Sequence, residues 1–218
     1  MRDSIGSNTI MMLIRNFVLI FILLFFSGSL SAQKRFKVVL NEANTMVDSY
    51  YLIDENGKIF RELDTLKYSI CFTQYSYGYF AVFGMKNIKG WAAIDANEQI
   101  LFNVYNASDG EPNPDKLVEG KIRIVNSDNL IGFANSKGQV IIRPQFESVS
   151  TFYKGKAIIG KACKEVPWDA HESENGCHHY SIVCRKHGYI NSKGIVLKIG
   201  NFKVGNIMRE IGWKAPKE

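Results

Sequence analysis

The chain has 218 residues, of which 46% are hydrophobic and 22% are charged. This composition excludes a disordered chain, because it supplies enough apolar side chains to bury a core. The net charge of +6 is mild and the 27 lysines and arginines are spread along the sequence, so no nucleic-acid partner is indicated.

Residues 1–32 have the composition of a secretory signal. Arg15 precedes an apolar run from Phe17 to Phe26, and a stretch of small residues follows and ends at Ala32. The run is short for a spanning helix, which needs about 20 residues. We therefore expect a signal helix that is cleaved off, leaving residues 33–218 exported to the periplasm or secreted, with no stable membrane span.

A turn motif recurs near residues 50–60, 91–101, 131–141 and 187–197. Its pattern is an apolar residue, Asp or Asn, two polar residues, glycine, any residue and an apolar residue. The Asx side chain caps its own turn by bonding to backbone two residues on, and glycine takes the positive φ of a tight hairpin. The turn positions are Asp54, Gly57, Asp95, Asn135, Gly138, Asn191 and Gly194, with Glu98 in the glycine place of the second copy.

The turns are flanked by β-branched residues and recur at a spacing of about 40 residues, which is typical of a repeat architecture. A further strand starts after a glycine at Gly78, Gly120 and Gly155. The sequence therefore predicts an all-β fold, a repeat array of antiparallel hairpins in three-stranded units over residues 33–218. The tail 203–210 fits a helix or a strand.

Two expectations follow from equivalence of the turns. The residues just before the Asx should point into one buried layer, and Glu98→Gly should be neutral or stabilising. The residues expected in that layer are Ile53, Ile94, Ala134 and Ile190.

The third copy carries more of a known pattern. Residues 132–146 read GFANSKGQVIIRPQF and residues 152–157 read FYKGKA. This resembles a WG-repeat unit, whose pattern is roughly Trp-Gly-Tyr-Ile-Asp, two residues, glycine, a valine-rich strand, Pro-x-Tyr and Phe-x-x-Gly-x-Ala. The naming dipeptide is degenerate in every copy. The resemblance implies β-rich repeats of exported and other bacterial proteins that act in binding, and it implies no reaction.

Aromatic residues at equivalent places in the motif are expected to fill the core between units, because a unit of this size cannot bury its apolar face alone. They are Trp91, Phe133 and Tyr189.

An insertion at 163–186 lengthens the last interval and carries Cys163, Cys177 and Cys184. Cysteines of an exported chain normally pair. If Ile124 faces Ile131 in the shorter hairpin, the same register puts Ile159 opposite His187 and Ala162 opposite Cys184. Cys163 then lies one residue from Cys184. A disulfide within the insertion is therefore expected, with Cys163–Cys184 and Cys163–Cys177 almost equally favoured and unpaired thiols as the remaining alternative.

A metal-binding or redox-active protein is the second functional hypothesis, centred on residues 163–187. Cys177, Cys184 and His187 are ligands that suit zinc or copper, but their spacing matches no common zinc pattern, so no metal is favoured. The chain has no phosphate loop, GxSxG or HExxH motif. We expect no cofactor and no catalytic residue, and we expect the acidic segment 109–115 to be a solvated loop.

The sequence thus favours an exported, non-enzymatic binding module whose partner is a protein, a peptide or an envelope polymer.

The signal predicts where the mature protein begins. Amino-terminal sequencing of protein from the cell envelope or medium should find the first residue at, or within a few residues of, Gln33. An intact Met1 or Met11 on that protein would contradict cleavage.

Overall fold

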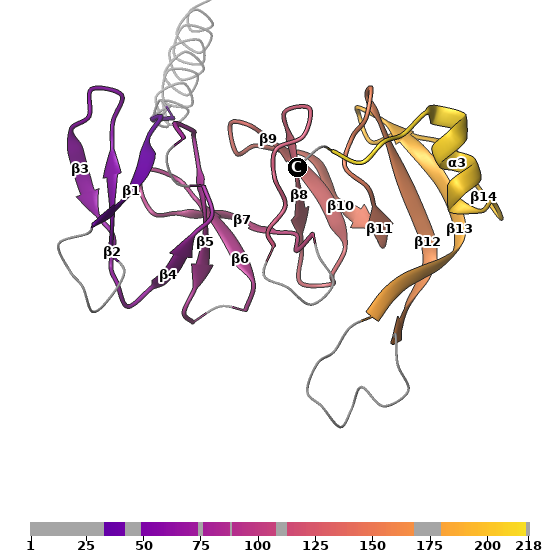
Figure 1. Ribbon diagram of the computed structural model, residues 1–218, viewed down its shortest axis with the longest axis horizontal. Coiled ribbons are helices and arrows are strands. Elements are labelled where there is room, and N and C mark those ends of the chain that lie inside the picture. The colour runs from indigo at the N-terminus through magenta and orange to yellow at the C-terminus, as the bar shows by residue number, and fades with distance from the viewer. Residues whose placement is uncertain are drawn as a thin grey trace, which may run out of the picture. The chain divides into compact units, whose positions relative to one another are not determined.

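The computed structural model describes residues 33–41, 49–73, 76–87, 89–107, 113–167 and 180–216. The expected signal helix at 1–32 lies outside these residues. The chain runs through antiparallel strands that form three sheets, shown in Figure 1. The three-stranded sheet has the order β1-β2-β3, the seven-stranded sheet β10-β9-β8-β7-β6-β5-β4, and the four-stranded sheet β11-β12-β13-β14.

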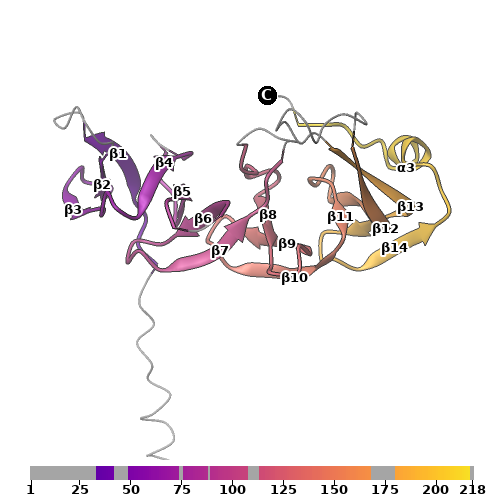
Figure 2. The ribbon, with the colours of Figure 1, turned by 90° about the horizontal axis from the view of Figure 1, so that it is seen from below.

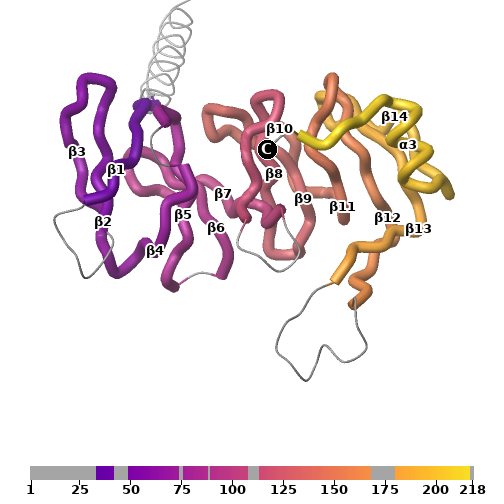
Figure 3. Tube along the Cα trace, viewed as in Figure 1, coloured from indigo at the N-terminus to yellow at the C-terminus, as the bar shows by residue number. Residues whose placement is uncertain are grey.

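The strands group into four three-stranded meanders, which we call repeats 1 to 4 (Figure 3). Repeat 1 has β1 (Lys37–Asn41), β2 (Ser49–Ile53) and β3 (Ile59–Glu62), and repeat 2 has β5 (Ala81–Met85), β6 (Trp91–Ile94) and β7 (Ile100–Val104). Repeat 3 has β8 (Lys121–Val125), β9 (Ile131–Asn135) and β10 (Val140–Phe146), and repeat 4 has β12 (Lys156–Pro167), β13 (Tyr180–Asn191) and β14 (Val196–Gly200). Short strands β4 (Tyr68–Cys71) and β11 (Ser148–Val149) pair with β5 and β12. The all-β repeat architecture expected from the sequence is confirmed.

Each predicted turn joins the second and third strands of one repeat. In every copy the Asx Oδ1 accepts two backbone N–H bonds, from the residues two and four positions later; for Asn135 these are 2.9 and 3.0 Å. The residue three positions later has positive φ in all four. These angles are 79° at Gly57, 62° at Glu98, 77° at Gly138 and 80° at Gly194.

A fifth turn of this kind joins β8 to β9 and was not recognised as a copy. Asn126 Oδ1 accepts bonds from the N–H groups of Asp128 and Leu130, and Asn129 takes φ 59° where the other copies have glycine. Asparagine tolerates this region better than most residues, which is why the pattern survives without glycine.

The fifth turn corrects the predicted register of that hairpin. Because the turn occupies residues 126–130, Val125 pairs with Ile131 and Ile124 pairs with Gly132. The expectation that Ile124 faces Ile131 is therefore wrong by one residue.

Three hydrophobic cores separate successive repeats. The first core, between repeats 1 and 2, includes Leu52, Phe83 and Ile94; the second, between repeats 2 and 3, includes Ala93, Ile122 and Ala134; the third, between repeats 3 and 4, includes Phe133, Ile142 and Ile190. Adjacent residues of one strand thus enter different cores, as successive side chains of a strand point to opposite faces.

The residues before the Asx do not share one buried layer, so that expectation is wrong. Ile94, Ala134 and Ile190 are each fully buried, but each enters the core on the amino-terminal side of its own repeat. Ile53 of the first repeat belongs to none of the three cores and is only half-buried. Within the described residues no repeat precedes repeat 1, so this position has no neighbour to pack against.

The three aromatic residues expected between units have different surroundings. Phe133 is buried in the third core and meets the Phe152 ring at a centroid distance of 4.8 Å. Trp91 is half-buried and packs on the second core. Tyr189 lies on the outer face of repeat 4, where its hydroxyl donates to Glu210 Oε1 at 3.4 Å.

Helix α3 (Val204–Ile211) covers that outer face, as it contacts β12 and β13 (Figure 2). Ile207 is fully buried, and Gly212 ends the helix at φ 64°. Glu210 also accepts a 2.7 Å bond from Lys198 of β14. The ambiguous tail is a helix because a terminal repeat needs a cover with an apolar inner side and a polar outer side. The described helix is not long and apolar enough to cross a membrane.

Glu98 occupies the position that holds glycine in the other predicted turns, and its side chain makes contacts that glycine could not make. Its carboxylate, 17% exposed, accepts bonds from Arg61 Nη1 at 3.1 Å and from the Tyr68 hydroxyl at 3.0 Å. Burial, and then the bond to Glu98, raises the pKa of Tyr68, which keeps this hydroxyl a donor. The side chain therefore ties the turn of repeat 2 to β3 and β4.

These contacts reverse the sequence-based expectation for Glu98→Gly. The left-handed backbone costs about 1 kcal/mol, whereas each hydrogen bond to a charged group contributes roughly 1.5 kcal/mol. We expect Glu98→Gly to lower the free energy of unfolding in urea by about 2 kcal/mol.

The matched control is the same change in an Arg61→Leu/Tyr68→Phe background, where only the backbone effect remains. There Glu98→Gly should stabilise by about 1 kcal/mol. If Glu98→Gly changed the free energy of unfolding equally in both backgrounds, the carboxylate contacts would contribute nothing.

Candidate functional site

A cleft of about 560 Å³ opens beside the segment that connects β7 to β8. Asn113, Asp115 and Lys116 of this segment form one side, and Thr151 and Trp213 are part of its lining as well. The wall is mixed, with the exposed side chains of Lys116 and Asn113 next to proline and tryptophan surfaces. Such a mixture suits recognition of a ligand that has both polar and apolar parts.

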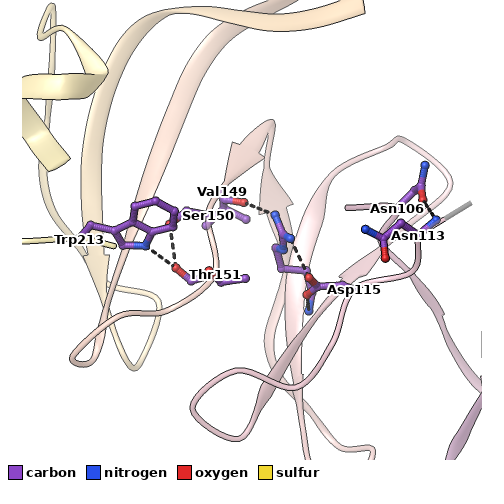
Figure 4. Close-up of polar contacts among 8 residues, drawn as sticks. Asn106, Asn113, Asp115, Val149, Ser150, Thr151 and Trp213 are labelled. Atoms are coloured by element: carbon purple, nitrogen blue, oxygen red, sulfur yellow. Dashed lines mark hydrogen bonds and ion pairs between the residues drawn. The ribbon is translucent and has the colours of Figure 1, made fainter. Parts of the chain in front are cut away.

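The base of the cleft holds a buried ion pair (Figure 4). Asp115 Oδ1 accepts from Arg123 Nη2 at 2.7 Å, and Oδ2 accepts from the Arg123 backbone N–H at 2.7 Å. The two side chains are only 5% and 13% exposed. Arg123 also donates to the Val149 carbonyl at 3.2 Å and lies over the Tyr105 ring. These bonds occupy both carboxylate oxygens and hold the arginine in one orientation.

Asp115 belongs to a position that recurs in the repeats. A side-chain oxygen of Thr73, Asp115 or Ser150 accepts the backbone N–H of the next long strand, at 3.0, 2.7 and 2.9 Å. The donors are Val82, Arg123 and Ile158. This bond locks the entry into each repeat, and in repeat 3 its acceptor carries a charge.

The expectation of a solvated loop at 109–115 is wrong for Asp115, which is 6% exposed. Residues 108–112 lie outside the described residues. The recurring acceptor could not be found from the sequence, since Thr, Asp and Ser share no residue-type pattern. A spacing of eight or nine residues to the strand donor was the only available signal.

Two anchors fix the walls of the cleft. Asn106 Oδ1 accepts from the Trp91 indole N–H at 3.3 Å and from the Asn113 backbone N–H at 3.0 Å. On the other side the Trp213 indole N–H donates to the Thr151 carbonyl at 2.9 Å, which attaches the carboxyl-terminal tail to the chain between β11 and β12 (Figure 4). The cleft is therefore formed by segments far apart in sequence and is held open by specific bonds.

Within the insertion, Cys163 and Cys184 form a disulfide. They pair directly across β12 and β13, with Ile159 opposite Gly188. The predicted register, with Ile159 opposite His187 and Ala162 opposite Cys184, is wrong by the same single residue as in repeat 3. Cys163 is therefore directly opposite Cys184 and not one residue away from that position.

The disulfide lies where the β12–β13 hairpin extends beyond the third core. We call residues 161–167 and 180–186 of this hairpin the arm. Beyond Gly160 side chains on both faces are exposed, including Lys164, Ile182 and Val183. A two-stranded hairpin is marginally stable by itself. The disulfide and a 2.7 Å bond from the Cys163 N–H to Glu147 together hold this arm in place.

The alternative metal ligands are not brought together in the described residues. Cys184 is bonded to Cys163, and His187 Nδ1 lies 2.9 Å from the Phe202 carbonyl. Cys177 lies outside the described residues. Across the parts of the chain that the structure describes, no group of three His, Cys, Asp or Glu side chains could hold a metal ion.

Cys71 is a buried thiol, 6% exposed, in the first core. Burial raises its pKa to about 11, so it is a protonated, unreactive group at neutral pH.

Comparison with known proteins matches residues 131–161 to a family model described as the WG containing repeat. This segment therefore carries one degenerate WG-repeat copy. The match covers β9, β10, β11 and the first part of β12. It confirms the resemblance expected from the sequence for this one degenerate copy. Neither a curated protein nor a solved structure matches the chain.

The structure explains the glycine of the WG repeat. A Cβ on Gly132 would collide with the backbone of Ile142 to Pro144, and one on Gly188 would collide with the Lys198 carbonyl. In both repeats the third strand crosses the second at this residue, and only hydrogen fits between them.

The disulfide predicts how the arm responds to reduction. Closing a loop with a sequence separation of 21 residues contributes about 3 kcal/mol in the chain-entropy model. Reductant should lower the melting temperature, Cys163→Ser should do the same, and reductant should have no further effect on that variant. Faster amide exchange should be confined to 161–167 and 180–186, with β9 as the internal control.

Peptide mapping of the non-reduced protein tests the Cys163–Cys184 bond directly. A Cys163–Cys177 link, or unmodified thiols at both Cys163 and Cys184, would contradict the structure.

Proposed function

We propose that this protein is an exported, non-enzymatic β-repeat module that binds a protein, a peptide or an envelope polymer. The observation that carries the proposal is the cleft beside Asp115. It combines a rigid base, an exposed cationic side chain at Lys116 and an aromatic wall at Trp213.

The chemistry of the cleft favours binding over catalysis. Both oxygens of Asp115 accept hydrogen bonds from Arg123, so this carboxylate is not positioned to take a proton from a ligand. Cys71 is a poor nucleophile because burial raises the pKa of its thiol.

Export is supported by two independent features. Residues 1–32 read as a signal, and the Cys163–Cys184 disulfide is the kind of bond that persists in oxidising compartments. The same bond weakens the metal and redox alternative, because it withdraws Cys184 from the ligand set. The mild positive charge fits binding outside the cell better than nucleic-acid binding.

A capture experiment with matched variants tests the proposal. Immobilised protein is exposed separately to the soluble proteins, the peptides and the polymer fragments of its own cell envelope. Lys116→Glu reverses a charge in the cleft, and Lys58→Glu makes the same change on an exposed turn of repeat 1.

One of the three pools should contain a species retained equally by wild type and Lys58→Glu, and about tenfold less by Lys116→Glu. Mass spectrometry should find that species unchanged after prolonged incubation. Failure to retain anything, equal retention by both variants, or chemical conversion of the retained species would overturn the proposal.

A further inference from the structure

Strand β14 has an open edge. It is the last strand in the order β11-β12-β13-β14 and pairs only with β13 among the described strands. Its outer backbone N–H and carbonyl groups therefore face away from the sheet, where another strand can pair with them.

Large apolar side chains are exposed along this edge and the segment around it. Val196 and Leu197 are 46% and 51% exposed, at the point where the pairing of β14 with β13 shifts register. The full exposed set is Ile195, Val196, Leu197, Ile199, Phe202 and Val204.

Two other edges of the described sheets, β10 and β3, carry more features that discourage pairing than β14 does. Strand β10 contains Pro144 and two register shifts, and β3 has four residues that include Arg61 and Glu62. Proline, bulges, shortness and charge all discourage strand addition. Strand β14 has no proline, one register shift against β13, and a single charged residue, Lys198, whose ammonium group pairs with Glu210.

The charges that flank β14 are positive, and the Glu210 carboxylate beside the strand is paired with Lys198. Lys193 and Lys203 flank β14, both are exposed, and neither has an ion-pair partner among the described residues. No Asp or Glu occurs from Asn191 to Arg209. Two copies of this edge would repel each other, whereas an acidic strand would be attracted.

A lipid surface fits this edge less well than a strand does. Inserting β14 into hydrocarbon would bury backbone groups with no hydrogen-bond partner, at several kcal/mol each. An added strand satisfies those groups and covers the apolar side chains at the same time.

We propose that β14 is a docking edge for an extended acidic segment of a partner protein, which adds to the four-stranded sheet next to β14. The segment alternates apolar and acidic residues, so that its apolar side chains cover Leu197 and Ile199 and its carboxylates reach Lys193 and Lys203. This surface shares no residue with the cleft beside Asp115, and the inference goes beyond the proposed function of that cleft.

The test uses ¹⁵N-labelled protein and a capped synthetic peptide of alternating glutamate and valine. Amide shifts and exchange protection should appear at Val196–Gly200 on addition of the peptide. A peptide with lysine in place of glutamate should bind at least about tenfold more weakly, as should the glutamate peptide to Lys193→Glu/Lys203→Glu protein. The control variant Lys58→Glu/Lys161→Glu carries the same charge change on other exposed sites and should bind as wild type does.

Several results would overturn the inference: no binding of the glutamate peptide, binding without protection of β14, or equal binding by the Lys193/Lys203 and control variants. Binding to anionic phosphatidylglycerol vesicles without binding to the peptide would assign the surface to a membrane instead, and concentration-dependent dimerisation through β14 would assign it to a second copy. Lys116→Glu should leave peptide binding unchanged, so the two proposals fail separately.

Discussion

The middle strands of repeats 2 and 3 are apolar and buried on both faces, and this constraint determines the rest of the architecture. A three-stranded meander covers neither face of its own middle strand. Ala93 and Ile94 are both fully buried, yet they enter cores shared with different neighbours. Each repeat is thus stable only next to another, as in other repeat arrays. The outer faces of the terminal repeats must be covered in another way. Helix α3 covers repeat 4 by burying Ile207 against it.

The Asx turn makes this stacking possible, because it sets the register of the second and third strands from within four or five residues. One side-chain oxygen satisfies two backbone N–H groups, and the next positive-φ residue closes the turn. Neither step requires a neighbouring repeat. Where the glycine place holds Glu98, the side chain adds a bond to the preceding repeat. The same position can therefore serve local geometry or contact between repeats.

The features that the sequence predicts depend on neighbouring residues, whereas those that it misses depend on residues far apart in the chain. The four turns and their glycines were readable since each depends only on residues next to one another. The predicted register of β12 with β13 differs from the observed one by one residue, because the turn at Asn126 has Asn129 in place of glycine and its sequence does not mark it as another copy. The burial of Asp115 is not predictable from the sequence, since its partner Arg123 meets it only after the chain folds back. The choice between Cys177 and Cys184 likewise required the pairing of β12 with β13.

The lengthened hairpin of repeat 4 shows that the two ends of a repeat have different freedom. The turn at Asn191 has the same bonds as that at Asn135, although the opposite end of its hairpin extends through 12-residue strands. A change in length at the tip between first and second strands is not transmitted to the turn between second and third. Such a fold separates a framework shared by the repeats from tips of variable length, much as an immunoglobulin domain does with its loops. New recognition surfaces could be grafted at these tips without altering how the repeats stack.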